Sequence, residues 1–150
     1  MRSMHYDYFI VARYRNKEQA IDLADRLRAA KKTVYCFAES EPSAQHVAVL
    51  DDDTEAAMAA FESIENWRED PRVRDIFETD MEALRASDAV VVLMPVGKSG
   101  HIESGVAYGL GKQTIMIGEQ VETESLYLIF DQEFSTVDLF IESIGSGLIG

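Results

Sequence analysis

The segment Ser87–Lys112 reads SDAVVVLMPVGKSGHIESGVAYGLGK. Its first part, Ala89–Met94, is a continuous run of apolar residues, which is typical of a strand buried on both faces of a parallel sheet. A loop with two glycines follows, and His101–Leu110 then has the pattern of a helix with Gly111 as its C-terminal stop. The segment therefore predicts a buried strand that is followed by a helix.

The same alternation of strand and helix extends over the rest of the chain. Expected strands are Tyr6–Ala12, Thr33–Phe37 and Thr114–Gly118, with Leu126–Phe130 as a candidate edge strand. Expected helices are Lys17–Ala30, a segment from Asp52 or Asp53 to about Asn66, Val73–Ala86 and Val137–Ile144. Alternating elements predict right-handed crossovers and a parallel sheet covered on both faces. We therefore expect an α/β three-layer sandwich of the flavodoxin-like (Rossmann-like) class, with a mostly parallel sheet of about five strands, in one domain over residues 1–150.

The composition excludes several classes of partner. The chain has 150 residues and a formal net charge of −13, which argues against a nucleic acid and against an anionic membrane surface, because both require clustered Lys and Arg. No apolar run approaches the ~20 residues of a membrane helix. The N-terminus has no signal-peptide pattern, and a single cysteine, Cys36, excludes an intrachain disulfide. We expect a cytoplasmic protein in which Cys36 is a buried, unreactive thiol.

In parallel α/β sheets, ligands bind beyond the carboxyl ends of the strands. That rule directs attention to three loops: Arg13–Asn16, Ala38–Glu41 and Pro95–Ile102. The last of these contains Gly97, Lys98, Ser99 and Gly100 just before the expected helix. Backbone N–H groups and the helix dipole favour an anion at such a position, Ser99 offers a hydroxyl or a helix cap, and Lys98 adds a positive charge. The alternative interpretation is an ordinary capped turn.

Four further polar residues are candidates for chemistry or binding. Glu103 is expected in the first turn of this helix, at the mouth of the cleft, either as a nucleophile or as a ligand for sugar hydroxyls; an ordinary first-turn glutamate is the alternative. His101 is expected either to contact a phosphate or to face solvent. His5 and His46 have no Cys or His partner at ligand spacing, so we expect no metal site, and nothing in the sequence indicates a cofactor.

The residues of this region resemble a known family. Six residues separate Asp80 from Ser87-Asp88, and an apolar strand, a Gly/Ser loop and the pattern E-x-G-x-A-x-x-x-G-K from Glu103 to Lys112 follow. This arrangement is similar to the nucleoside 2-deoxyribosyltransferases and their nucleotide N-glycosidase relatives. The resemblance covers roughly residues 77–117 well and the first strands only in outline. It implies a parallel α/β fold, no cofactor, and cleavage of an N-glycosidic bond.

The resemblance also implies roles for individual residues. Glu103 matches the catalytic glutamate that attacks the anomeric carbon, and Asp80 matches the aspartate that contacts the base. Asp88 completes the motif and is placed with the substrate-binding residues. In the nucleotide-cleaving relatives, the loop that matches Ser99 and Gly100 holds a 5′-phosphate, and their first loop carries an arginine near the position of Arg13 or Arg15. Gly97, Lys98 and His101 lie beside Ser99 and Gly100 and are placed with the same phosphate contacts, and Tyr14 is the aromatic option in the first loop. Tyr127 lies in a region that caps the pocket in the relatives, for which packing is the alternative.

Two departures from the family pattern shape the functional hypotheses. The deoxyribosyltransferases carry acidic residues before the catalytic glutamate, whereas this chain has VGKSGHI, which favours a nucleoside 5′-monophosphate and hydrolysis. The usual first-loop signature is absent, since the chain has VARYRN there, which keeps open a non-catalytic module that binds a nucleotide or an ADP-ribose-type ligand. A homodimer or larger homo-oligomer is expected because the relatives complete their pockets across subunits.

Overall fold

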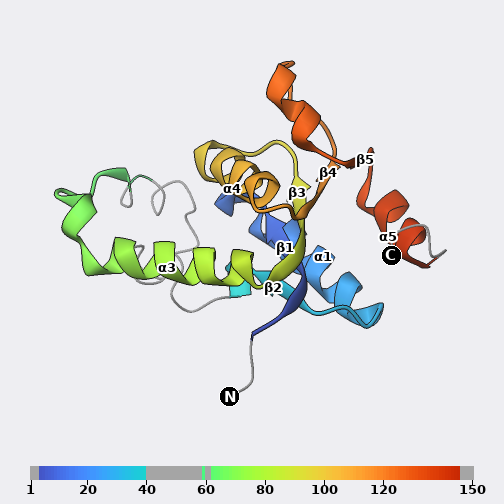
Figure 1. The fold of residues 1–150 in the computed structure, drawn as a ribbon, viewed down its shortest axis with the longest axis horizontal. Helices are drawn as coiled ribbons and strands as arrows, with labels where there is room; N and C mark the ends of the chain where they lie inside the picture. Colours follow the sequence, from blue (N-terminus) through green and yellow to red (C-terminus); the bar gives the residue numbers. More distant parts are fainter. Residues whose placement is uncertain (1–3, 40–58, 60–61, 146–150) are drawn as a thin grey trace.

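Five parallel strands form one sheet in the order β2-β1-β3-β4-β5 (Figure 1). The computed structural model describes residues 4–39, 59 and 62–145. The strands are β1 (Tyr6–Val11), β2 (Val34–Cys36), β3 (Ser87–Leu93), β4 (Gln113–Ile117) and β5 (Gln132–Phe134). This order and direction confirm the expected flavodoxin-like α/β fold.

Two helices cover each face of the sheet (Figure 1). One face is covered by α1 (Lys17–Ala29) and α5 (Val137–Gly145), and the other by α3 (Pro71–Arg85) and α4 (Lys98–Gly109). Short 3-10 helices lie at η1 (Tyr14–Asn16), η2 (Phe37–Glu39), η4 (Trp67–Glu69) and η5 (Ser125–Ile129). The arrangement therefore has three layers, with an apolar cluster on each side of the sheet.

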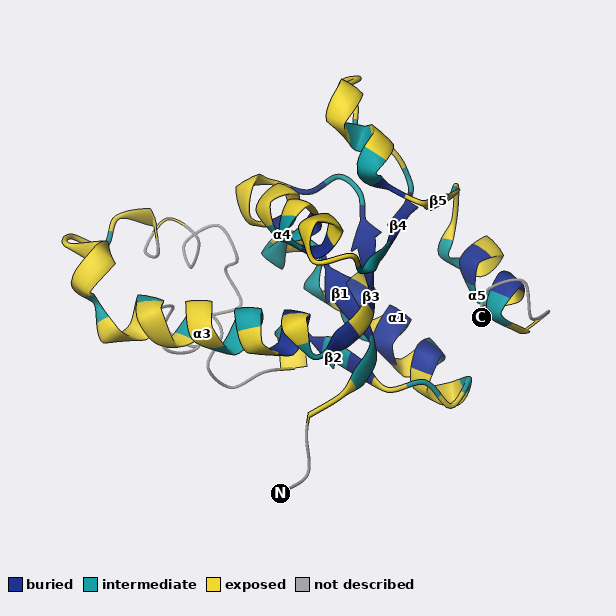
Figure 2. Cartoon of the chain, viewed as in Figure 1, coloured by how far each residue is buried: buried dark blue, intermediate teal, exposed yellow. Residues whose placement is uncertain are grey.

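The centre of the sheet is the most buried part of the protein (Figure 2). Val90, Val91 and Val92 of β3 have no exposed surface, because helices cover both faces of this strand. Leu23 of α1 and Phe140 of α5 are also fully buried. They belong to the apolar cluster on the face of the sheet opposite α3. The continuous apolar run in the sequence thus corresponds to the central strand.

Helix α4 begins earlier than the sequence suggested. It starts at Lys98 rather than at His101, and Gly97 is its N-cap residue without a side-chain cap. Gly100 fits inside the first turn because an added Cβ there would lie 2.5 Å from the Cβ of Val96. The expectation that Ser99 caps this helix was wrong, and Glu103 lies in its second turn rather than its first.

Helix α3 also begins earlier, at Pro71 rather than at Val73. Asp70 is the N-cap, its carboxylate accepts a hydrogen bond from the backbone N–H of Arg72 at 2.8 Å, and Pro71 occupies the first helical position. Proline suits that position because its missing N–H would have no intrahelical partner there. The helix expected from Asp52 or Asp53 to about Asn66 lies mostly outside the described residues.

The edge strand is not where the apolar pattern placed it. Leu126–Phe130 belongs largely to the 3-10 helix η5, in which Leu126 and Leu128 are exposed and the Glu124 side chain accepts from the Leu126 N–H. The edge strand is instead β5, Gln132–Phe134, which pairs with β4. Short edge strands carry polar residues, so the apolar run was misleading here.

None of the helices in the described part of the chain is both long and apolar enough to cross a lipid bilayer.

Cys36, at the end of β2, is 3% exposed, and burial raises the pKa of its thiol to about 11. The expected burial of the thiol is therefore confirmed, and its raised pKa is in line with low reactivity.

Candidate functional site

A cavity of about 550 Å³ opens at the carboxyl ends of β1 and β3. These neighbouring strands are followed by connections to opposite faces of the sheet, since α1 follows β1 on one face and α4 follows β3 on the other. That position is the topological switch point, where α/β sheets bind their ligands. The volume falls within the range of small-molecule sites.

Most residues predicted from the sequence line this cavity. The structure brings together the two predicted carboxylates and the two predicted loops: Arg13, Tyr14, Arg15, Asp80, Gly97, Lys98, Ser99, Gly100 and Glu103. Nine further residues line the cavity that were not predicted as site residues. Most of them are apolar, and one glutamate and one glutamine join them: Phe9, Ile10, Ala12, Phe37, Glu62, Ile76, Pro95, Val96 and Gln120. Phe37 and Gln120 follow the ends of β2 and β4, so the strand-end rule contained a signal for both.

Two carboxyl groups, from different helices, face this cavity. Asp80 comes from the middle of α3 and Glu103 from the second turn of α4. Burial, and to a lesser extent the negative charge of Asp80, together raise the pKa of Glu103 to about 8. Burial also raises the pKa of Asp80 to about 6, while a hydrogen bond from the Tyr35 hydroxyl acts the other way. The pair therefore holds about one proton at neutral pH, as interacting carboxyl groups often do.

Tyr35 positions Asp80. Its hydroxyl donates to Oδ1 of Asp80 at 3.2 Å, and its ring stacks on Phe9 with 5.1 Å between the centroids. Tyr35 was not predicted as a site residue, because its side chain reaches the site from the strand β2 rather than from a loop. The contact fixes one carboxylate oxygen of Asp80 and leaves the other for a ligand.

Positive charge lies at another part of the cavity wall. The Nε atom of Arg13 is buried and has no hydrogen-bond partner among the described residues. Leaving such a donor unpaired typically costs ~1–3 kcal/mol. The N–H groups of Lys98, Ser99 and Gly100 begin α4 and precede its first intrahelical bond, from His101 to Gly97 at 3.1 Å. These donors and the guanidinium together suit an anionic group of a ligand.

Two contacts shape the loop between β3 and α4. The Gln120 side-chain oxygen accepts from the Val96 N–H at 3.2 Å, and the Lys98 ammonium lies 3.6 Å from a carboxylate oxygen of Glu62. The Lys98 side chain is 87% exposed, so this ion pair contributes little stability. Lys98 is therefore free to exchange Glu62 for a ligand anion.

His101 and Tyr127 contact one another beside the cavity rather than lining it. The ring nitrogens of His101 lie 2.8 Å from the Gly97 carbonyl oxygen and 2.9 Å from the Tyr127 hydroxyl. A carbonyl only accepts, so Nδ1 donates to Gly97, and in the neutral ring Nε2 accepts from Tyr127. The pair joins η5 to the start of α4, which supports the packing interpretation of Tyr127.

Asp88 does not reach the cavity. It lies near the start of β3, is exposed, and bonds to His5 at 3.0 Å. The cavity lies at the other end of this strand, about 17 Å away at ~3.3 Å per residue. The structure thus separates Asp88 from the other predicted substrate-binding residues.

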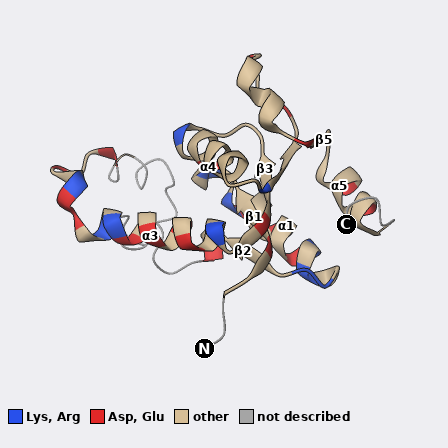
Figure 3. Ribbon diagram, viewed as in Figure 1, with Lys and Arg blue, Asp and Glu red and all other residues tan. Residues whose placement is uncertain are grey.

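No protein-family model matches this chain, and a search of curated proteins finds no match. The function of this chain is therefore inferred from the residues of the cavity. The features of the cavity are an apolar wall, two carboxyl groups with raised pKa values, and a cationic loop. Helix α3 beside it carries basic side chains toward its two ends and acidic side chains between them (Figure 3), so the positive character of the cavity is local to the loops after β1 and β3.

Proposed function

We propose that this protein cleaves the N-glycosidic bond of a nucleoside or nucleoside 5′-monophosphate, with Glu103 as the nucleophile and water or a second base as the acceptor. The observation that carries the proposal is the pairing of Asp80 and Glu103 at one cavity with donors for an anion. The resemblance to nucleoside 2-deoxyribosyltransferases and nucleotide N-glycosidases supports the same assignment.

The chemistry uses the shared proton. When the proton resides on Asp80, Glu103 is a carboxylate that attacks the anomeric carbon. The bond from that carbon to the base nitrogen breaks, its electron pair stays on the nitrogen, and Asp80 supplies the proton that the departing base needs. Water then attacks the same carbon and gives one proton to the Asp80 carboxylate, and this releases the sugar and regenerates the Glu103 carboxylate. The carboxylates also stabilise the positive charge of the oxocarbenium-like transition state.

A 5′-phosphate fits the cationic part of the cavity. The buried Nε of Arg13 and the N–H groups at the start of α4 have no competing acceptor among the described residues, and Lys98 is available nearby. A phosphate oxygen would satisfy these donors. We therefore favour a nucleoside 5′-monophosphate over an unphosphorylated nucleoside, and hydrolysis over transfer.

The test is release of free base, followed by chromatography. The substrates are ribo- and deoxyribonucleosides and their 5′-monophosphates, each with and without a second base. We expect base release from a monophosphate without acceptor, and its loss in Glu103→Gln. Glu82→Gln, an exposed glutamate of α3, is the matched control and should retain turnover. An active Glu103→Gln variant would contradict the mechanism.

One observation favours a second candidate function, a binding module without turnover. With its pKa at about 8, Glu103 is mainly protonated in the empty cavity at neutral pH. A protonated carboxyl both donates and accepts hydrogen bonds, which suits a sugar hydroxyl. Thermal stabilisation by a nucleotide or an ADP-ribose-type ligand, without base release, would favour this function over the enzyme.

The proposal includes a cytoplasmic homodimer or larger homo-oligomer. Supporting it, large apolar side chains are exposed on the layer formed by α3 and α4: Phe77, Ile102, Tyr108 and Leu110 are each at least half exposed. Exposed apolar side chains of this size are a common feature of subunit interfaces. Sedimentation equilibrium tests the assembly, and a monomer at all concentrations would contradict it.

A further inference from the structure

A second group of polar side chains lies at the opposite end of the sheet from the cavity. His5 precedes β1, Asp7 lies within β1, and Asp88 lies in β3. The two strands pair in parallel with Tyr6 beside Ser87 and Tyr8 beside Ala89. Asp7 and Asp88 therefore lie side by side in the register, although 81 positions separate them in the sequence.

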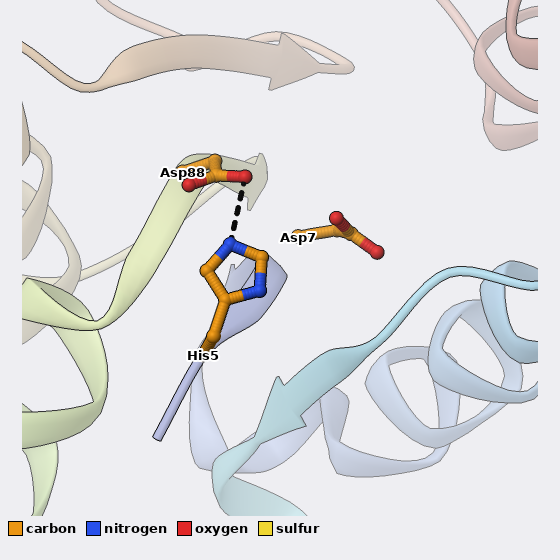
Figure 4. A group of neighbouring side chains, drawn as sticks. All are labelled: His5, Asp7 and Asp88. Atoms are coloured by element: carbon orange, nitrogen blue, oxygen red, sulfur yellow. Dashed lines mark hydrogen bonds and ion pairs between the residues drawn. The ribbon is translucent and has the colours of Figure 1, made fainter. Parts of the chain in front are cut away.

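The three side chains converge. The Nε2 atom of His5 lies 3.0 Å from Oδ2 of Asp88, and one ligand atom from each of the three residues lies within 4.8 Å of the other two. Figure 4 shows the imidazole of His5 below the Asp88 carboxylate, with the Asp7 carboxylate beside it. This group was not predicted, because the expectation of no metal site rested on Cys and His spacing alone and left out the aspartates.

Asp7 is held in place by Thr33. The backbone N–H and the hydroxyl of Thr33 both donate to Oδ2 of Asp7, at 2.8 and 3.1 Å. The other carboxylate oxygen takes part in neither bond. Hydrogen bonds of this kind orient the ligating carboxylates of metal sites.

We propose that His5, Asp7 and Asp88 bind Zn²⁺ or a chemically similar divalent transition-metal ion. One imidazole nitrogen and two carboxylate oxygens form a donor set that suits such ions better than Mg²⁺ or Ca²⁺, which prefer oxygen ligands alone. Water completes the coordination at this exposed position. The dication also neutralises two adjacent carboxylates of a chain whose net charge is −13.

Binding of an ion requires the ligand atoms to move closer together. Ligands at ~2.0–2.2 Å from a tetrahedral Zn²⁺ lie about 3.3 Å from one another. The contact of His5 with Asp88, at 3.0 Å, is close to this spacing, whereas the three ligand atoms together lie within 4.8 Å of one another. The side chains of His5 and Asp88 are 58% and 64% exposed, so they can turn toward the fixed Asp7 without disturbing the core.

The experiment measures Zn²⁺ binding to the tag-free full chain by isothermal titration calorimetry, together with the visible absorption of bound Co²⁺. We expect one ion per chain at submillimolar Zn²⁺. Asp88→Asn and His5→Ala should each weaken binding by about tenfold or more, since each removes a direct ligand. His101→Ala, an exposed histidine at the cavity end, is the matched control and should bind as the wild type does.

Two outcomes would overturn the proposal. One is the absence of Zn²⁺ binding, in which case His5 and Asp88 form only an exposed ion pair. The other is binding that the His5 and Asp88 substitutions leave unchanged, or that His101→Ala weakens equally. Circular dichroism of each variant verifies that it is folded. Because this group lies at the far end of β3 from Glu103, neither outcome depends on the proposed enzymatic function.

Discussion

Replacing Glu103 by glutamine is predicted to change how the stability of the protein depends on pH. The pKa of Glu103 is about 8 in the folded protein, against an ordinary value of 4.5. Between these values the unfolded chain carries an ionised Glu103 and the folded protein a protonated one. The folded state therefore binds more protons, and raising the pH through this window lowers the free energy of unfolding.

The size of the effect follows from the pKa values. One proton contributes about 1.4 kcal/mol per pH unit in such a window. From pH 6 to pH 8 the loss amounts to about 2 kcal/mol, because Glu103 itself begins to ionise as the pH approaches 8. Asp80 adds little here, because its pKa of about 6 lies at the lower edge of this interval. Glu103→Gln removes this loss because an amide does not titrate.

The assay is urea unfolding followed by circular dichroism at pH 6, 7 and 8. The histidines titrate in the same interval, but they are common to both proteins, so the difference between wild type and Glu103→Gln isolates the carboxyl group. Glu82→Gln, which alters an exposed glutamate, should keep the wild-type slope. Equal pH dependence in wild type and Glu103→Gln would refute the assignment of a buried, protonated carboxyl group.

Four further substitutions test the site and the core. Tyr35→Phe should raise the pKa of Asp80 above 6, because it removes a hydrogen bond that lowers this pKa; a carbon-detected NMR titration measures it, and an unchanged pKa would contradict the contact. Gly100→Ala should destabilise the protein by ~1–3 kcal/mol, since its Cβ would meet a neighbouring side chain at 2.5 Å. Gly105→Ala, which meets nothing within 4 Å, should instead stabilise α4 by ~0.5–1 kcal/mol, and thermal unfolding distinguishes the two. Leu23→Ala should cost ~2–5 kcal/mol because this side chain is fully buried, and a loss below 1 kcal/mol in urea unfolding would contradict that packing.

The fold was predictable where the hydrophobic pattern is decisive. The run around Val91 has one physical interpretation, a strand covered on both faces, and the alternation of elements then fixes a parallel sheet. Helix starts were harder, because the pattern does not distinguish a loop glycine from one such as Gly100 that a close contact requires. The edge strand was missed because β5 is short and polar, whereas an apolar run precedes it.

The cavity was predictable in its location but only partly in its composition. The strand-end rule identified the loops that carry Arg13 and Lys98, because it depends only on strand direction. Asp80 comes from the middle of a helix, so it entered only through the resemblance to a known family. Tyr35 and the cluster around His5 depend on contacts between strands, which require the register of the sheet and not just the sequence.

The burial of Cys36 at the end of β2 has a consequence for measuring motion. The thiolate is the reactive form, and a thiol whose pKa is about 11 holds very little of it at neutral pH. A thiol-specific reagent therefore modifies this side chain only when the end of β2 opens. Since it is the only cysteine in the chain, the rate of its modification reports the opening of that strand directly, with no label to be introduced. Phe37, the next residue, lines the cavity. A ligand that stabilises this part of the molecule therefore lowers the rate of Cys36 modification.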